Sequence, residues 1–297
     1  MAKRALVLGG GGPVGIAWEA GLLAGFAEAG VDLAQADHVV GTSAGSFVGA
    51  QIAMGRSPAT LVAPILAEGQ SASASRPSGG SGAPDLSVLF MKMQEAISGV
   101  RPMQEVRAEI GAWALSAKTI SEEAFIGNFG RSFSGLPEDA WPDRSYACTA
   151  VDAVDGSFVV WNRESSIGVT RAVASSCSVP GVFPPITIKG RRYIDGGMRS
   201  PTNADLARGY DVAVVVAVRG AVIDPAVTAK FQQLLDGELQ VLRDGGARVE
   251  LIIPDAASVD AFGLNLMDPR RRPGAAQAGI DQGRAAAVRL RSLWSAG

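Results

Sequence analysis

The stretch Gly41-Thr42-Ser43-Ala44-Gly45 follows a short apolar run over residues 37–40 and precedes a series of small, helix-forming residues. Its Gly-x-Ser-x-Gly spacing is that of a nucleophile elbow, a sharp strand-to-helix turn that exposes a serine hydroxyl. Glycines suit both ends of this turn because backbone passes close to backbone there, and a Cβ would clash. The sequence therefore predicts a strand, a tight turn carrying Ser43, and a helix over 45–54.

The chain contains a single histidine, His38, and its position restricts the chemistry available to Ser43. A nucleophilic serine usually works with a histidine base. His38 lies five residues upstream on the predicted strand. Five residues of strand span about 16 Å, far beyond the hydrogen bond of about 3 Å that a base must make. If Ser43 is a nucleophile, its proton must therefore pass to a carboxylate or an amine.

A second glycine-rich turn follows the first predicted strand, residues 4–8. Gly10, Gly12 and Gly15 satisfy Gly-x-Gly-x-x-Gly, the dinucleotide fingerprint, which also requires an acidic residue at the end of the second strand. That strand ends in the serine turn instead. The other functional interpretation is an oxyanion hole, in which the N–H groups of Gly10, Gly11 and Gly12 at a helix N-terminus hold negative charge. A plain tight turn is the third interpretation.

An aspartate at the end of a later apolar segment is the candidate base. Asp195 is followed by Gly196 and Gly197, a sequence that is also typical of an ordinary turn. A carboxylate close to Ser43 could accept its proton, provided that the site is partly dry and the pKa of the carboxyl is raised. Asp152, at the end of another predicted strand, is the next candidate.

Composition favours a globular protein and excludes several other classes. The 297 residues are 47% hydrophobic and 19% charged, which is enough for a sizeable core. A net charge of −2 gives no general attraction for nucleic acid. Two cysteines make no disulfide framework, and the N-terminus has no apolar run of signal-peptide length, so we expect a cytoplasmic protein. No uncharged apolar run reaches the about 18 residues of a membrane span, although peripheral membrane contact is compatible with the sequence.

Strand and helix patterns alternate along the chain, which predicts an α/β fold with a mostly parallel sheet covered by helices on both faces. Predicted strands lie at 4–8, 37–40, 145–151, 157–161, 212–218 and 249–253, with an extended segment over 184–194. Predicted helices lie at 14–29, 45–54, 57–68, 85–97, 103–117, 121–133, 169–176 and 275–294. Residues 69–84 are rich in Ser, Ala, Gly and Pro and are predicted to form a mobile loop. We expect one domain over 1–297, with a helical cap over the site at about 69–140.

Taken together, the motifs resemble the patatin-like phospholipase family. Three match in order, namely the glycine loop at 10–15, the serine turn at 41–45 and Asp195-Gly196-Gly197. The segment 172–185 also looks like the family's segment before its aspartate. The chain departs from the common pattern at Val14, where the family often has Arg or Lys, and at residues 201–203.

This resemblance implies an α/β fold with a Ser43–Asp195 dyad and no catalytic histidine, and with Gly10, Gly11 and Gly12 as the oxyanion hole. It also implies hydrolysis of lipid acyl esters. We therefore expect a serine acyl hydrolase that acts on a lipid or other acyl-ester substrate, requires no metal or organic cofactor, and has no nucleic-acid partner. A nucleotide-binding protein that uses the glycine turn and a non-catalytic lipid-binding protein are the alternatives.

Overall fold

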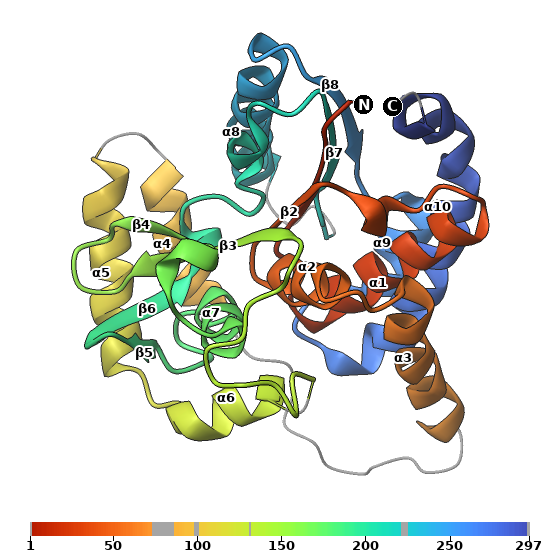
Figure 1. Ribbon diagram of the computed structural model, residues 1–297. Helices are drawn as coiled ribbons and strands as arrows, with labels where there is room; N and C mark the ends of the chain where they lie inside the picture. Colours follow the sequence, from red (N-terminus) through yellow and green to blue (C-terminus); the bar gives the residue numbers. More distant parts are fainter. Residues whose placement is uncertain (1, 73–85, 98–100, 131, 221–224, 296–297) are drawn as a thin grey trace.

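Eight strands form one mixed sheet at the centre of the described part of the chain (Figure 1). The computed structural model describes residues 2–72, 86–97, 101–130, 132–220 and 225–295. Following the hydrogen-bonded pairs, the strands are β5 (Ile186–Ile188), β6 (Arg191–Asp195), β3 (Ser145–Asp152), β2 (His38–Gly41), β1 (Arg4–Leu8), β7 (Val212–Val216) and β8 (Arg248–Ile252). The five from β3 to β8 run parallel, whereas β6, β5 and β4 (Phe158–Trp161) are antiparallel additions.

One group of helices covers one face of this sheet. They are α1 (Gly12–Glu28), α2 (Ala44–Ala53), α3 (Pro58–Ala72), α7 (Val169–Ser176) and α10 (Arg272–Ser295). Leu6 and Leu8 of β1 point into the core that these helices build. The α1 and α10 backbones touch, because a Cβ on Gly21 would stand only 2.1 Å from the carbonyl oxygen of Ala276.

The alternate residues of the same strands face a second helical layer. Ala5 and Val7 of β1 pack with Leu235 and Leu239 of α8 (Pro225–Asp244). Further along the sheet, α4 (Ser87–Ile97) and α5 (Met103–Ser116) cover β3 and β6. Figure 1 shows α4 and α5 on the side of the molecule opposite to α3 and α10. The predicted mostly parallel α/β fold with both faces covered is confirmed.

Within the segment of about 69–140, the described residues include helices, as predicted. Besides α4 and α5 these include α6 (Glu122–Gly130), which packs on the segment after α7 through stacked rings of Phe125 and Phe183, 4.3 Å between centroids. The loop predicted at 69–84 begins later than expected, because α3 continues to Ala72, and its remainder lies outside the described residues.

Two other parts of the fold differ from the prediction. The segment predicted as extended over 184–194 is a hairpin of β5 and β6, turning at Lys189 and Gly190, which both have positive φ. The helices α8 and α9 (Ala256–Phe262) have no predicted counterpart. None of residues 225–234 in the first half of α8 is buried, so this half lacks the buried apolar face by which an amphipathic helix is recognised.

Candidate active site

Ser43 lies at the apex of a strained turn between β2 and α2. Its φ of 52° and ψ of −116° fall outside the regions that a non-glycine residue normally adopts, and strain of this kind is typical of functional sites. The flanking glycines have no room for a side chain. A Cβ on Gly41 would stand 2.4 Å from the Cα of Ser46, and one on Gly45 would stand 2.1 Å from the carbonyl oxygen of Leu8. The predicted strand–turn–helix is thus present.

The end of α7 holds the backbone of this turn. The N–H of Ser43 donates to the hydroxyl of Ser176 at 3.0 Å, and its carbonyl oxygen accepts from the thiol of Cys177 at 3.1 Å and from the hydroxyl of Ser46 at 2.6 Å. Sequence reasoning missed these contacts. The available signal was the run of small polar residues at Ser175–Ser178, shortly before Pro180. Such a run at the end of a helix indicates that its side chains have polar partners.

Strand β3 brings Asp195 to the serine turn. Gly41 of β2 pairs with Cys148, and Asp195 of β6 pairs with Ala150, two residues further along β3. Both β3 residues pair with β4 on their other side, so β2 and β6 meet end to end along one edge of β3. The two motifs, 152 positions apart in the sequence, are therefore neighbours in space.

The carboxyl of Asp195 is buried, and its surroundings set its basicity. It is 2% exposed, and burial raises the pKa of Asp195 to about 7. The Ser43 side chain and the backbone N–H of Gly197 limit that rise. The Gly197 N–H reaches Oδ1 of Asp195 at 2.7 Å. The structure thus places together a strained serine and a carboxyl with a pKa in the range of a general base.

The glycine loop lies against Ser43 at the N-terminus of α1. A Cβ on Gly10 would stand 3.3 Å from the Cβ of Ser43. The N–H of Gly10 is occupied, because it donates to the carbonyl oxygen of Pro201 at 2.7 Å. The N–H groups of Gly11 and Gly12 have no acceptor among the described residues. Val14, where the resemblance leads one to expect a cation, is fully buried in the core.

A further unused donor starts the neighbouring helix. The N–H of Ala44, the first residue of α2, has no acceptor within the part of the chain that the structure describes. The starts of α1 and α2 are close, since a Cβ on Gly15 would be 3.4 Å from the Cβ of Ala44. The sequence pattern alone did not single out Ala44.

The other candidate titratable groups are engaged elsewhere. His38 is the first residue of β2. Its Nδ1 shares a hydrogen bond with the hydroxyl of Ser145 at 2.7 Å, and its ring stacks on the ring of Tyr210. Burial lowers the pKa of His38. Asp152 forms an ion pair with Arg191 and caps the turn after β3, so it is committed to a structural contact.

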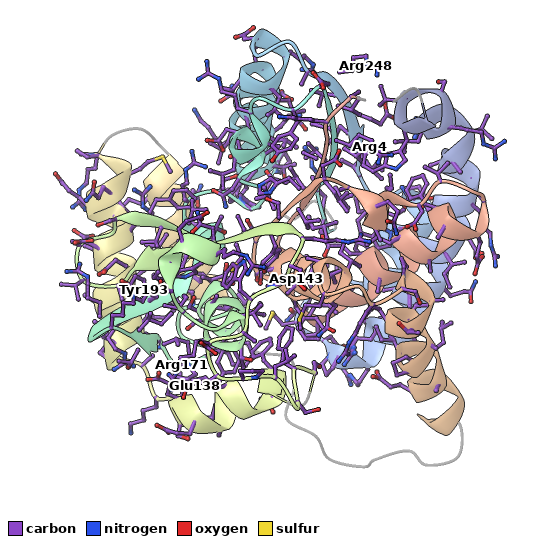
Figure 2. The ribbon with its side chains drawn as sticks, in the orientation of Figure 1. Arg4, Glu138, Asp143, Arg171, Tyr193 and Arg248 are labelled. Carbon is purple, nitrogen blue, oxygen red and sulfur yellow. The ribbon has the colours of Figure 1, made fainter. Side chains whose placement is uncertain are left out.

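The surface carries a separate polar cavity of about 700 Å³ whose lining includes Glu122, Glu138 and Arg171 but neither Ser43 nor Asp195. Figure 2 shows Glu138 and Arg171 side by side, and Arg171 Nε lies 3.9 Å from Glu138 Oε1. Within the described ranges, no three His, Cys, Asp or Glu side chains are grouped as metal ligands would be. None of the described helices combines the length and apolar character needed to cross a bilayer.

Comparison with solved structures gives distant similarities. VipD from Legionella pneumophila aligns with a TM-score of 0.48 and 16% identity over 97% of this chain and 67% of that chain. The ExoU–SpcU complex from the type III secretion system of Pseudomonas aeruginosa aligns with a TM-score of 0.43 and 17% identity over 98% of this chain and 52% of that chain.

Sequence comparison is more specific. The lysophospholipase NTE1 of Kluyveromyces lactis is 27% identical over 222 residues, which is 74% of this chain. The match spans only 13% of that much longer protein. The family model for patatin-like phospholipases matches residues 6–208, which include the glycine loop, the serine turn and Asp195. The chain belongs to the patatin-like phospholipase family.

Proposed function

We propose that this protein is a serine lipid acyl hydrolase in which Ser43 is the nucleophile and Asp195 the general base. Family membership implies lipid hydrolysis. The observation that carries the dyad is the buried Asp195 carboxyl beside the serine turn, whose pKa is raised by burial to about 7 and is lowered in part by the Ser43 side chain. His38, engaged with Ser145 and Tyr210, is not available as an alternative base.

In the first half of the reaction, Ser43 Oγ attacks the ester carbonyl carbon while its proton passes to Asp195. The tetrahedral intermediate then collapses, the carbon–oxygen bond to the alcohol breaks, and the alcohol leaves with the proton from Asp195. In the second half, Asp195 takes a proton from water as the water attacks the acyl-enzyme, and returns it to Ser43 as the carboxylic acid departs.

Negative charge on the former carbonyl oxygen needs donors close to Ser43. The proposed donors are the N–H groups of Gly11 and Gly12, joined by Ala44, because these have no acceptor among the described residues. Two helix N-termini, those of α1 and α2, add their dipoles at the same place. Gly10 belongs to the same loop, but its N–H is held by Pro201, so its proposed role is to place the loop beside Ser43.

The proposed substrates are lipid acyl esters, with lysophospholipids as the first class to examine because a matching relative is named a lysophospholipase. The proposed catalytic domain spans residues 1–297, because α10 packs along α1 in the same core as the serine turn. A cytoplasmic location and peripheral contact with a lipid surface belong to the proposal. The two cysteines, which are buried and unpaired, suit a reducing compartment.

The experiment that tests this function measures fatty-acid release from lysophosphatidylcholine by wild type, Ser43→Ala and Ser175→Ala. Ser175 is a matched control, since it is a buried serine whose hydroxyl binds Trp161 rather than the serine turn. We expect release by wild type and Ser175→Ala and none by Ser43→Ala. Full activity of Ser43→Ala would overturn the proposal. Vesicle binding without release would favour a lipid-binding protein, and a rise in melting temperature with NAD would favour a nucleotide-binding protein.

A further inference from the structure

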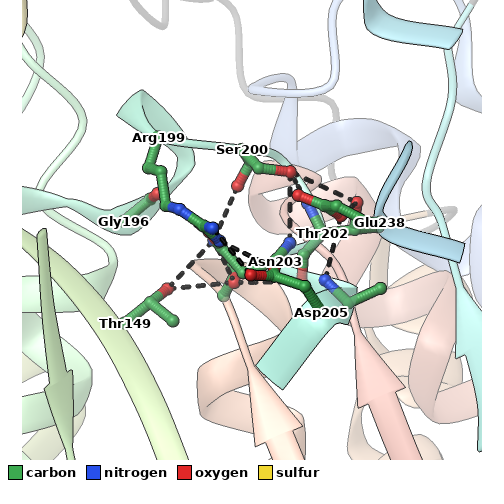
Figure 3. Close-up of polar contacts among 10 residues, drawn as sticks. Thr149, Gly196, Arg199, Ser200, Thr202, Asn203, Asp205 and Glu238 are labelled. Atoms are coloured by element: carbon green, nitrogen blue, oxygen red, sulfur yellow. Dashed lines mark hydrogen bonds and ion pairs between the residues drawn. The ribbon is translucent and has the colours of Figure 1, made fainter. Parts of the chain in front are cut away.

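One short turn, residues 200–203, contacts all three motifs of the candidate site. The carbonyl oxygen of Pro201 accepts the N–H of Gly10 in the glycine loop at 2.7 Å. The side-chain amide of Asn203 donates to the hydroxyl of Thr42, which precedes Ser43, at 3.0 Å. The same amide donates to the carbonyl oxygen of Gly196, which follows Asp195, at 3.3 Å (Figure 3).

Asn203 has a conformation and a hydrogen-bond set that few residues could reproduce. It is fully buried and left-handed, with φ of 51° and ψ of 40°, a region that asparagine tolerates better than most residues. Its Nδ2 also donates to the carbonyl oxygen of Ser200 at 2.7 Å, while its Oδ1 accepts from Arg199 at 2.8 Å. The Nδ2 donor of Asn203 therefore faces Thr42 and Gly196, and its Oδ1 acceptor faces Arg199.

The turn is itself fixed to a helix on the other face of the sheet. Oε2 of Glu238 in α8 accepts from the hydroxyl of Thr202 and from the backbone N–H of Ala204, each at 2.9 Å. Arg199, which holds Oδ1 of Asn203, forms an ion pair with Asp205 at 2.7 Å. The turn thus has little freedom to move relative to the core, and neither do the groups that it binds.

We propose that Asn203 is a positioning residue that sets the separation between Ser43 and Asp195, acting through Thr42 and Gly196. The inference rests on the proposed function, because it assigns Asn203 a role in the same reaction. Thr42 and Gly196 are each bonded directly to a member of the dyad, so a shift of either moves the nucleophile or the base. Misplacement of reacting groups by about 1 Å can reduce a rate about 10²-fold.

Asn203→Asp is the most informative substitution, because aspartate keeps the size and tolerates the left-handed backbone. It replaces the donor facing Thr42 and Gly196 with an acceptor. We expect kcat for lipid ester hydrolysis to fall about 10²-fold with KM changed less than about threefold. The acid limb of kcat/KM should also move to higher pH, because the added negative charge near Asp195 raises the pKa of that carboxyl.

Thr42→Val is the second variant, since it removes the hydroxyl that Asn203 binds, together with the contact of that hydroxyl to Thr149. We expect it to lower kcat as well, and the double variant to lose less than the product of the two single losses. Gln240→Ala is the control, because this exposed residue of α8 contacts Asp244 and not the turn. It should keep kcat within about threefold of wild type. If Asn203→Asp does not fold, the test is the kcat of Thr42→Val alone. A kcat at least about tenfold below that of wild type then supports the inference.

Some outcomes would overturn the inference alone. A kcat of the Asn203→Asp variant within twofold of wild type would do so. Losses of kcat in the two single variants that simply multiply in the double variant would also do so. If Asn203→Asp does not fold, an unchanged kcat in Thr42→Val would overturn the inference. Absence of Ser43-dependent hydrolysis in wild type would instead overturn the proposed function, and this inference with it.

Discussion

The backbone N–H of Ser43 donates to the hydroxyl of Ser176 at 3.0 Å, so a side chain from α7 fixes the strained turn that carries the candidate nucleophile. Both residues are buried. The strained backbone of Ser43 is thereby held in place by tertiary contacts rather than by its own local preference.

Ser176→Ala should therefore reduce both stability and activity. Leaving the Ser43 N–H without an acceptor costs about 1–3 kcal/mol in the free energy of unfolding. Relaxation of the turn should lower kcat about tenfold. Ser175→Ala, on the same helix, leaves the Trp161 N–H unpaired instead and should lose similar stability while keeping its activity. Equal losses of activity in the two variants, measured beside their denaturation midpoints, would contradict a specific role for Ser176.

Gly45→Ala should prevent stable folding. The new Cβ would stand 2.1 Å from the carbonyl oxygen of Leu8, and neither backbone can move without breaking the pairing of β1. We expect a loss above about 4 kcal/mol, seen as insoluble or unfolded protein. Gly237→Ala in α8 is the matched change in open space, and there we expect a gain of about 0.5–1 kcal/mol. Folded Gly45→Ala protein with wild-type stability would show that the close approach is wrong.

Asp195→Asn should be more stable than wild type at high pH. A carboxyl whose pKa is higher in the folded than in the unfolded state stabilises the fold at low pH, and that contribution is lost as the pH rises through about 7. An asparagine avoids this loss and can still accept from Gly197 through its oxygen. The gain should approach about 4 kcal/mol above pH 7 and vanish near pH 4, as melting temperatures across that range would reveal.

Glu19→Gln provides a control for the loss of a buried charge. Burial also raises the pKa of Glu19 well above its usual value, and the backbone of Gly9 offsets only part of that rise. Glu19→Gln should gain stability at high pH and keep its hydrolytic activity, whereas Asp195→Asn gains stability and loses activity. Equal loss of activity in both would indicate that the effect is not specific to the base.

The rate should depend on the protonation of Asp195. As general base it must be ionised before Ser43 attacks, and burial raises the pKa of Asp195 to about 7. We expect kcat/KM to increase about tenfold per pH unit below pH 7 and to level off above it. Steady-state rates with a soluble ester, whose own ionisation does not change in this range, provide the measurement. A rate already level at pH 5 would assign the proton to another group.

Local signals were sufficient for the strands and turns around the site. Gly41 and Gly45 predicted a close backbone approach, and the structure places backbone atoms where their side chains would be. The valine-rich run at 212–218 was predicted as a strand, and all five residues of β7 are buried. In both cases the local structure is determined by the same residues that form the sequence pattern, so the pattern was sufficient to predict it.

Other features depend on partners that are distant in the sequence. The β5–β6 hairpin turns through Lys189 with φ of 49°, and lysine gives no local indication of a left-handed turn. The contacts of Asn203 involve Thr42, 161 positions away, and Thr149, 54 positions away. No local pattern could identify them, because β3 and β6 must first assemble to bring these residues together.

Covalent labelling of Ser43 tests the Ser–Asp dyad most directly. Wild type, Ser43→Ala and Asp195→Asn would be treated with a lipid-like fluorophosphonate at pH 8, and the adduct followed by intact-protein mass spectrometry. We predict one adduct on wild type, none on Ser43→Ala, and labelling of Asp195→Asn slowed by at least about 10²-fold because the general base is missing. An adduct that persists in Ser43→Ala, or labelling of Asp195→Asn at the wild-type rate, would contradict an activated Ser43 that depends on Asp195.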